Sequence, residues 1–381
     1  MESVIKDRRI GWDKVKLEDV LDYEQPTKYI VKSENYNNSF KTPVLTAGKS
    51  FILGYTDEED GIFENLPVII FDDFTTDIKY VDFPFKVKSS AMKILKVNKG
   101  KADLRFLYYK MQTLKIDCEQ HKRYWISKFA IHEIELPPLE TQKRIAEILD
   151  TADALRRNDE ELLKKYEDLA QAIFIDMFGD PVKNEKGWEV RKLGEISTKI
   201  TDGTHITPKY KNEGIIFLSA KNIKKFKLND DSPKFIGEDE HEELKKRCSV
   251  EKGDILLTKS GSLGMAAMNN FNFEFSIFES LALIKYSREK VIGKFLLHFL
   301  NTPSTQFQFN KMTKGVGVKH LHLNDIRNVL IVLPPISLQN NFAEIIFSVE
   351  LQMEKIRENL NKTTIIFNSL IQKAFNGELV N

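Results

Sequence analysis

The chain has 381 residues, of which 41% are hydrophobic, and a formal net charge of +1. This length allows two or three domains with substantial cores, and the two cysteines, Cys118 and Cys248, lie in no metal-ligand spacing, which argues against a disulfide framework or a zinc site. Residues 1–12 carry five charged side chains and no later stretch approaches twenty apolar residues without a charge, so we expect a cytoplasmic protein that is neither secreted nor membrane-spanning.

Three short motifs occur twice in the same order. They begin with Gly11-Trp12 and Gly187-Trp188, with Leu136-Pro137-Pro138 and Leu333-Pro334-Pro335, and with Leu169-Ala170-Gln171 and Leu370-Ile371-Gln372. The stretch between the first and second motifs matches poorly and is longer in the second copy. We therefore predict a repeated framework, in the order domain, helix, domain, helix, around two globular parts that are built differently.

A long helix is predicted after each Pro-Pro pair, because proline suits the first turn of a helix. Apolar residues follow at spacings of three and four: Ile145, Ile148, Ala152, Leu155, Leu162, Tyr166, Leu169 and Ile173, and then Ile346, Val349, Met353, Ile356, Leu360, Phe367, Leu370 and Ala374. Gly179 and Gly377 are the expected ends. Each helix has one apolar seam and a domain lies between them, so the simplest arrangement is an antiparallel pair.

The predicted architecture is therefore α/β (α+β), with two globular domains alternating with two long α-helices that pair as an antiparallel coiled coil. The expected boundaries are 1–138 for the first globular domain, 139–179 for the central helix, 180–335 for the second globular domain and 336–381 for the C-terminal helix. From Glu140 to Phe178 the first helix would be about 58 Å long, at 1.5 Å per residue.

The motifs of DNA-processing enzymes are missing from the sequence. Ala47-Gly48-Lys49-Ser50 resembles the end of a phosphate-binding loop, but Pro43 stands where that loop needs glycine. The seven histidines form no HExxH motif, and no methyl-transfer or cofactor-binding motif is present. We therefore predict no catalytic residue, no metal site and no cofactor.

Polar and basic loops in the second globular domain are the first candidates for contact with DNA. Segments 215–218 and 254–258 are predicted to be buried strands that run into such loops. Hydroxyl, amine and imidazole groups reach phosphates or base edges, and asparagine suits adenine. The candidates are Thr204, His205, Lys209, Tyr210, Lys221, Asn222, Lys259, Ser260, Lys314, Lys319 and His320.

The first globular domain offers a second set near predicted turns. Its members are Lys41, Thr46, Lys49, Lys86, Lys88, Arg123 and Tyr124. For any single residue of either set, an ordinary solvated side chain is the alternative. Five basic residues on the outward faces of the helices are candidates for docking other subunits, with the same alternative: Arg144, Arg156, Arg157, Lys355 and Arg357.

The framework motifs resemble the specificity subunit of type I restriction-modification systems. The resemblance is carried by residues 136–149, 177–181 and 373–379, with 201–210, 217–223 and 253–261 in the second domain and 42–55 and 68–95 in the first, and it covers essentially the whole chain. It implies two target-recognition domains, a split recognition sequence in double-stranded DNA, and no catalysis by this chain. It also implies two methyltransferase subunits and restriction subunits, with translocase and nuclease activity, as partners.

Other readings of the sequence remain open. A single-chain enzyme would need the motifs that are missing, whereas a scaffold that binds only proteins would show weak DNA affinity that is insensitive to salt. An unexpressed or recombining spare copy of the subunit would have the same sequence features. If the reading is correct, a helix of ~58 Å limits the span of the DNA target to about 17 base pairs at 3.4 Å each.

Overall fold

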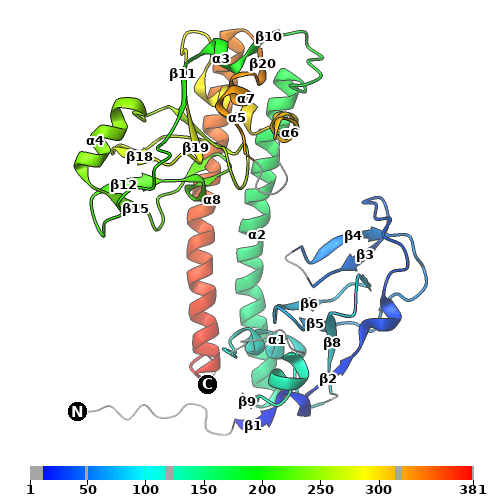
Figure 1. Ribbon diagram of the computed structural model, residues 1–381. Helices are drawn as coiled ribbons and strands as arrows, with labels where there is room; N and C mark the ends of the chain where they lie inside the picture. The colour runs from blue at the N-terminus through cyan, green and yellow to red at the C-terminus, as the bar shows by residue number, and fades with distance from the viewer. Residues whose placement is uncertain (1–11, 48–49, 99, 117–123, 314–319, 380–381) are drawn as a thin grey trace, which may run out of the picture. The chain divides into compact units, whose positions relative to one another are not determined.

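The computed structural model describes residues 12–379 apart from 48–49, 99, 117–123 and 314–319 (Figure 1). The chain divides into two compact units, one formed by Met1–Glu160 and Glu358–Asn381 and the other by Glu161–Arg357. The two longest helices, α2 (Leu139–Phe178) and α8 (Ile336–Phe375), have 40 residues each and contribute one part to each unit. No helix in the described ranges is long and apolar enough to cross a membrane.

Two sheets form the globular part of the first unit. Its strands are β1 (Asp13–Lys16), β2 (Leu21–Glu24), β3 (Thr42–Leu45), β4 (Ile52–Thr56), β5 (Val68–Asp72), β6 (Ile78–Val81), β7 (Lys86–Val87), β8 (Met92–Val97) and β9 (Glu133–Leu136), and its helix is α1 (Leu104–Gln112). Antiparallel strands in the order β2-β8-β5-β6 make one sheet. In the other, β3 pairs antiparallel with β4 and parallel with β7, while β1 pairs separately with β9.

The second unit has more elements. Its strands are β10 (Glu189–Lys192), β11 (Ser197–Asp202), β12 (Ile215–Leu218), β13 (Ile223–Lys224), β14 (Lys227–Leu228), β15 (Lys234–Ile236), β16 (Ile255–Thr258), β17 (Ala266–Met268), β18 (Phe275–Ile277), β19 (Leu281–Tyr286) and β20 (Leu330–Leu333). Its helices are α3 (Leu193–Ile196), α4 (Glu238–Arg247), α5 (Gly293–Leu300), α6 (Pro303–Met312) and α7 (Leu323–Arg327).

The two units share one sheet topology, although the intervening sequences match poorly. The order β11-β19-β16-β17 repeats β2-β8-β5-β6, and β12, like β3, has an antiparallel neighbour, β15, and a parallel one, β18. The pair β10 with β20 repeats β1 with β9. The expectation of differently built globular parts was therefore wrong at the level of topology. The extra length of the second unit lies in additions such as α4, the β13–β14 hairpin, α6 and α7.

A buried glutamine closes each repeat in the same way. The side-chain amide of Gln142 accepts a hydrogen bond from the backbone N–H of Asp103, the residue before α1, at 2.8 Å and donates to the carbonyl of Pro137 at 2.7 Å. Gln339 repeats this arrangement with Ile292, before α5, at 2.9 Å and with Pro334 at 2.8 Å. Through this glutamine, the start of each long helix is bonded to the residue just before the short helix that follows the larger sheet. That short helix is α1 in the first unit and α5 in the second.

The long helices run antiparallel within each unit, as predicted. In the first unit, Ile145 and Ala152 of α2 share a core with Phe367 and Ala374 of α8. In the second unit, the ring of Phe174 in α2 lies 5.4 Å from that of Phe342 in α8. Since the start of α2 meets the end of α8 and the end of α2 meets the start of α8, the pair is antiparallel in both.

The predicted seam was correct for α8 and wrong in part for α2. The α8 seam residues Ile346, Val349, Met353, Ile356, Phe367 and Ala374 are buried, whereas Leu155, Leu162 and Leu169 of α2 are exposed. Arg156 and Asp159 take seam positions between them: Arg156 lies 5.7 Å from the ring of Phe367, and Asp159 accepts a hydrogen bond from Thr363 at 3.2 Å. The spacing of apolar residues could not locate the middle of the contact between the helices, because polar side chains occupy it.

Candidate nucleic-acid interface

Several candidate loops of the second unit converge on residues 278–281, just before and into β19. The backbone N–H of Glu279 donates to the carbonyl of Thr204 at 2.9 Å, and that of Lys259 donates to the carbonyl of Ser280 at 2.8 Å. The backbone N–H of Ala220 donates to the hydroxyl of Ser280 at 3.0 Å. Residues 204–205, 219–222 and 259–260 are distant in sequence, and these bonds bring them to one edge of the unit.

A fourth segment joins this edge through a bridge between Ser260 and His320. The backbone N–H of Leu321 also donates to the carbonyl of Lys259 at 2.9 Å. Gly203 permits the arrangement, because a Cβ at this position would lie 1.9 Å from the carbonyl oxygen of Ile277. Gly203 is thus a point of close backbone approach.

Asp202 is the electrostatic centre of this edge. Its buried carboxylate accepts a hydrogen bond from the ammonium of Lys259 at 2.5 Å, lies 3.2 Å from the imidazole of His205, and forms an ion pair with Arg247. Burial acts to raise the pKa of Asp202, but the hydrogen bond and positive charge of Lys259, with the charges of His205 and Arg247, lower the pKa overall. The carboxylate therefore stays charged at neutral pH and holds the side chains of Lys259, Arg247 and His205 together.

The predicted residues of the second unit differ in what they present to solvent. Lys209, Lys221 and His320 are exposed, and neither lysine has an ion-pair partner among the described residues. Tyr210 is 43% exposed, with the ammonium of Lys234 3.9 Å from its ring centroid. Thr204, His205 and Ser260 lie on the converging edge described above. These residues leave hydroxyl, amine and imidazole groups available to a phosphate or a base.

Two of the predicted contacts do not fit the structure. The ammonium of Lys259 is buried against Asp202, so it cannot reach a phosphate in this conformation. The side-chain oxygen of Asn222 accepts a hydrogen bond from the backbone of Ser219 at 3.0 Å, so the amide cannot pair with adenine through both of its groups. Lys314 and Lys319 lie outside the described residues.

The candidates of the first unit lie around β3 and β7. The backbone N–H of Lys88, just after β7, donates to the carbonyl of Leu45 at 2.8 Å, which places Lys88 beside Thr46 at the carboxyl ends of these parallel strands. The ammonium of Lys88 is paired with Glu34. Lys41, at the opposite end of β3, is exposed beside a hollow of about 480 Å³ lined by Ile52 and Tyr55.

Two candidates of the first unit belong to its interior instead. Lys86 is 1% exposed, and its ammonium lies 3.1 Å from Glu58 and donates to the carbonyl of Asp60. Tyr124 is buried in the core that contains Phe106 and Leu107. Both residues are polar and lie near predicted turns, as surface residues do, so the sequence alone did not show that they are buried. Lys49 and Arg123 lie outside the described residues.

The basic residues predicted for subunit docking are mostly engaged within their own helices. Arg156 and Arg157 both pair with Asp153, and Arg357 lies 3.5 Å from Glu354. Arg144 and Lys355 are exposed without an ion pair in the described part of the chain. The more unusual surface on α8 is apolar: Phe347 and Leu351, one turn apart, are 64% and 48% exposed.

Sequence reasoning missed several residues that shape the interface. Arg247 and Ser280 organise the converging edge, and Lys234 covers the ring of Tyr210. Their roles depend on contacts between segments that are distant in sequence, so no local motif marks them. The side chain of Ile206, at 79% exposure, is an apolar group within the same loop as His205.

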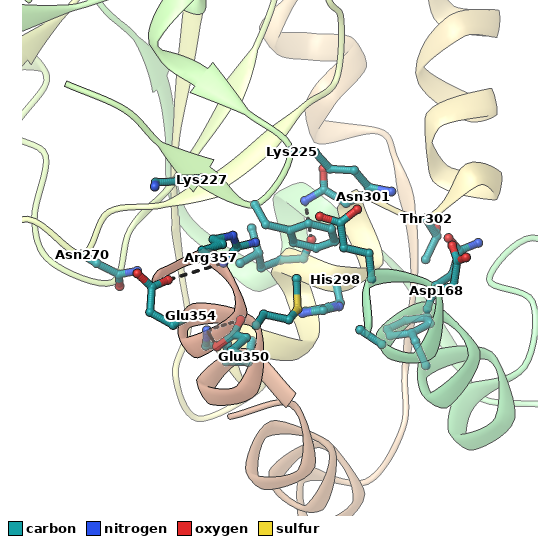
Figure 2. Close-up of a pocket in the computed structure, with 18 residues that line it drawn as sticks. Asp168, Lys225, Lys227, Asn270, His298, Asn301, Thr302, Glu350, Glu354 and Arg357 are labelled. Carbon is teal, nitrogen blue, oxygen red and sulfur yellow. Dashed lines mark hydrogen bonds and ion pairs between the residues drawn. The ribbon is translucent and has the colours of Figure 1, made fainter. Parts of the chain in front are cut away.

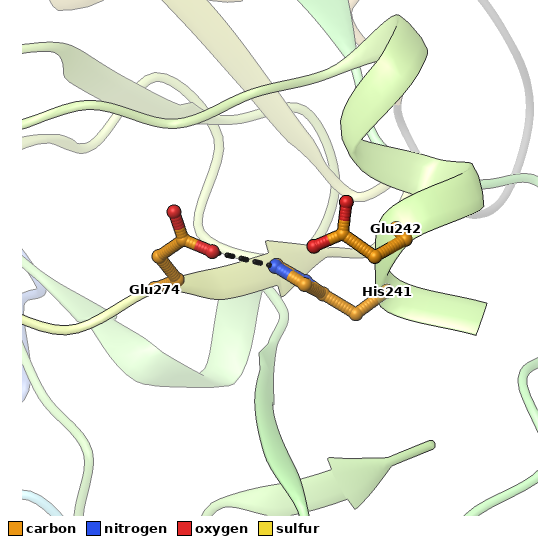
Figure 3. A group of neighbouring side chains, drawn as sticks. All are labelled: His241, Glu242 and Glu274. Atoms are coloured by element: carbon orange, nitrogen blue, oxygen red, sulfur yellow. Dashed lines mark hydrogen bonds and ion pairs between the residues drawn. The ribbon is translucent and has the colours of Figure 1, made fainter. Parts of the chain in front are cut away.

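One group of possible metal ligands occurs among the described residues: His241 and Glu242 on α4, and Glu274 before β18 (Figure 3). Nδ1 of His241 lies 2.9 Å from the hydroxyl of Ser276 and Nε2 lies 3.2 Å from Glu274. The ammonium of Lys245 is within 2.7 Å of both oxygens of Glu274. Because a cation of the protein already neutralises this carboxylate, we interpret the group as an ion-paired contact between α4 and β18.

Comparison with known proteins agrees with this architecture. The family model for the type I restriction modification DNA specificity domain matches residues 9–165 and 185–363. The specificity subunit of the type I restriction enzymes EcoR124I and EcoR124II of Escherichia coli is 30% identical, over 94% of this chain and 91% of that protein. The MjaIX specificity subunit of Methanocaldococcus jannaschii is 29% identical over 65% of this chain and 60% of that protein.

A solved structure has the same fold. The S subunit of the type I restriction-modification system of M. genitalium superposes with a TM-score of 0.57, covering 98% of both chains at 15% sequence identity. The family model matches most of the chain in two copies, each of which includes one globular region and part of a long helix. This chain therefore belongs to the family of type I restriction-modification DNA specificity proteins.

Proposed function

We propose that this chain is a non-catalytic subunit that recognises a two-part DNA target and directs methyltransferase and restriction subunits to it. In this proposal, residues 1–138 and 180–335 each read one half of the target in double-stranded DNA. The helical segments 139–179 and 336–381 set the spacing between the halves and dock two methyltransferase subunits, and restriction subunits join that complex. Catalysis belongs to these partners.

The observation that supports reading of two half-sites is the repeated topology with different loops. Both units carry the same two sheets, so both present loops from corresponding strand ends. The loops themselves differ: in the second unit Thr204, His205 and Ser260 meet on one edge, whereas in the first Thr46 and Lys88 follow β3 and β7. A shared scaffold with different loop chemistry suits two different base sequences.

Docking of partners is supported by apolar side chains on the outer faces of the long helices. Phe347 and Leu351 form such a surface in the second unit, and Leu155, Ile365 and Ile366 are 54–60% exposed in the first. Apolar groups exposed in neighbouring turns are costly in water and are commonly covered by another protein. We therefore assign docking to these residues, with Arg144 and Lys355 at their polar margin.

The test of the function is methylation sequencing in cells that carry this chain with its partner methyltransferase. A methylated motif of two separated halves is expected, and it should vanish when this gene alone is deleted. His205→Ala should relax the sequence requirement in one half of the motif, and Lys41→Ala should weaken methylation without relaxing that half. Methylation that is unchanged by the deletion would contradict the proposal and favour a silent copy or a scaffold.

A binding measurement separates DNA reading from scaffolding. In the assembled complex, removing Lys209 and Lys221 together should reduce the slope of log affinity against log salt by about 2, since each lysine neutralises one phosphate. The matched control is Lys290→Ala, an exposed lysine between β19 and α5, which should leave the slope unchanged. A slope near zero for the unaltered complex would favour a protein scaffold.

A further inference from the structure

A cavity of about 440 Å³ lies within the second unit, between α2, α8, α5 and the β13–β14 hairpin (Figure 2). Its volume falls in the range of small-molecule sites, roughly 300–1,000 Å³. It is separate from the edge where Thr204 and Ser260 meet, because none of those residues lines it. The proposed DNA reading therefore gives this cavity no role.

The cavity has an aromatic and apolar wall. Phe174 of α2, Met353 of α8 and Phe226 of the hairpin line it, together with His298 of α5. The imidazole of His298 lies 4.6 Å from the ring of Phe226, with 36° between their planes. Phe226 has a φ of 68°, a backbone conformation that L-residues seldom adopt, and it holds its ring over the imidazole. A flat apolar group in the cavity would face aromatic surfaces.

His298 is a buried polar group without a partner. The side chain is 7% exposed, and its Nε2 has no hydrogen bond in the described structure. Burial, aided by the charges of Lys294 and Lys225, lowers the pKa of His298 to about 3, so the ring is neutral near pH 7 and offers one N–H and one acceptor nitrogen. Buried polar atoms are rarely left unpaired, and the residue that carries this one lines a cavity.

The charges at the rim are of two kinds. Lys294 is paired with Glu350 at 2.6 Å, and Arg357 lies 3.5 Å from Glu354, so these groups are neutralised within the protein. Lys225 and Lys227 of the hairpin have no carboxylate partner among the described residues; Figure 2 shows Lys227 at the left of the view and Lys225 above its centre.

Asp168 of α2, at the right of Figure 2, also has no ion pair in the described part of the chain. The carboxylate is exposed, so it is free to accept hydrogen bonds from a ligand. The lining thus offers free cations on the hairpin and a free hydrogen-bond acceptor on α2.

We propose that this cavity binds a nucleoside phosphate. The base would pack against Phe226 and Phe174 with its polar edge at the imidazole of His298. The phosphate would meet Lys225 and Lys227, which suit an anion. The sugar hydroxyls would donate to Asp168, as ribose hydroxyls donate to a carboxylate in other nucleotide sites. His298, Lys225, Lys227 and Asp168 then each have one part of the ligand as a partner.

The test is calorimetric titration of the full chain, without DNA, using the four nucleoside monophosphates, their nucleosides, ribose 5-phosphate and inorganic phosphate. At least one nucleoside monophosphate should bind at one site per chain. Its nucleoside should bind about tenfold more weakly, because it loses a charge-assisted hydrogen bond from the phosphate, and ribose 5-phosphate should also bind about tenfold more weakly, because it loses the packing of the base on the aromatic rings. Equal binding of inorganic phosphate would overturn the proposal, as would dissociation constants weaker than about 1 mM for all four nucleotides.

Matched variants distinguish the site from a structural cavity. Lys225→Ala with Lys227→Ala should weaken nucleotide binding about tenfold and leave nucleoside binding unchanged, whereas Lys224→Ala on the same hairpin should change neither. His298→Phe keeps a ring against Phe226 and should weaken both ligands. If His298 only fills the core, the phenylalanine variant will raise the melting temperature and leave binding unchanged, and the proposal is wrong. DNA affinity is a separate readout, so failure here leaves the proposed function standing.

Discussion

Replacement of Asp202 by asparagine tests the electrostatic centre of the second unit. The carboxylate is 3% exposed and compensates the buried ammonium of Lys259, at 2.5 Å. Asparagine has nearly the same shape and still accepts a hydrogen bond from Lys259, but it removes the negative charge. The variant therefore isolates the cost of leaving a buried ammonium without its counter-charge.

The expected loss is about 3 kcal/mol of stability in the second unit, at the lower end of the roughly 3–5 kcal/mol measured when one partner of a buried ion pair is removed. Arg247 and His205 add little, because their side chains are more than half exposed and pairs of that kind contribute about 0–1 kcal/mol. Since the pKa of Asp202 is lowered in the folded state, its contribution is present above its unfolded pKa of about 3.9 and is lost as the pH falls through the folded value.

Hydrogen exchange at neutral pH, read strand by strand, measures this loss. Protection of β16, in the second unit, should fall by about 3 kcal/mol, while β5 in the first unit serves as an internal reference. Asp230→Asn, at an exposed aspartate of the same unit, is the matched control and should change neither strand. The electrostatic reasoning fails if Asp202→Asn costs less than about 1 kcal/mol, or if the difference from the unaltered chain persists undiminished well below pH 3.9.

Three further predictions follow from the repeated framework and the helices. Gln142→Leu should destabilise the first unit and Gln339→Leu the second by about 2–5 kcal/mol each, because two backbone groups lose their partner in each case; unit-resolved hydrogen exchange shows whether each effect stays in its own unit. Phe347→Asp should abolish association with a methyltransferase subunit in size-exclusion chromatography, whereas Gln352→Asp, at another exposed position of α8, should not. Insertion of seven residues into both α2 and α8 keeps the seam in register and adds ~10 Å, so methylation sequencing should report a spacer about 3 base pairs longer; an unchanged spacer would disprove the assigned role of the helices.

The framework was predictable because its signals are local. The Pro-Pro pairs and the terminal glycines mark helix ends by backbone chemistry, and α2 indeed ends before Gly179, which has a φ of 78°. The shared topology of the globular parts was not predictable from the same sequence. Strand order depends on which segments pair across long separations, and β3 and β12 can occupy equivalent places with few identical residues, since a buried strand requires apolar side chains rather than particular ones.

The sequence was enough to predict which loops form the candidate interface. It was not enough to predict which side chains in those loops are exposed. Lys86 and Lys221 are both lysines near turns, yet one is 1% exposed and the other is free at the surface. Lys86 is buried because it forms an ion pair with Glu58, which is distant in the sequence. Lys259 is buried for the same reason, through its ion pair with Asp202. A buried lysine requires such a partner, because an unpaired ammonium is too costly to desolvate.

Burial of a lysine in an ion pair also affects how a loop recognises DNA. A lysine buried in an ion pair stabilises the shape of a loop and does not contact phosphate. Its substitution should therefore alter which bases the loop reads without a proportional change in the salt dependence of DNA affinity. Lys259 holds this position in the second unit, since its backbone bonds connect it to Ser280 and Leu321 while its ammonium is fixed by Asp202. Sequence divergence at such interior pairs is therefore a route by which one scaffold can acquire new targets while its surface charge stays the same.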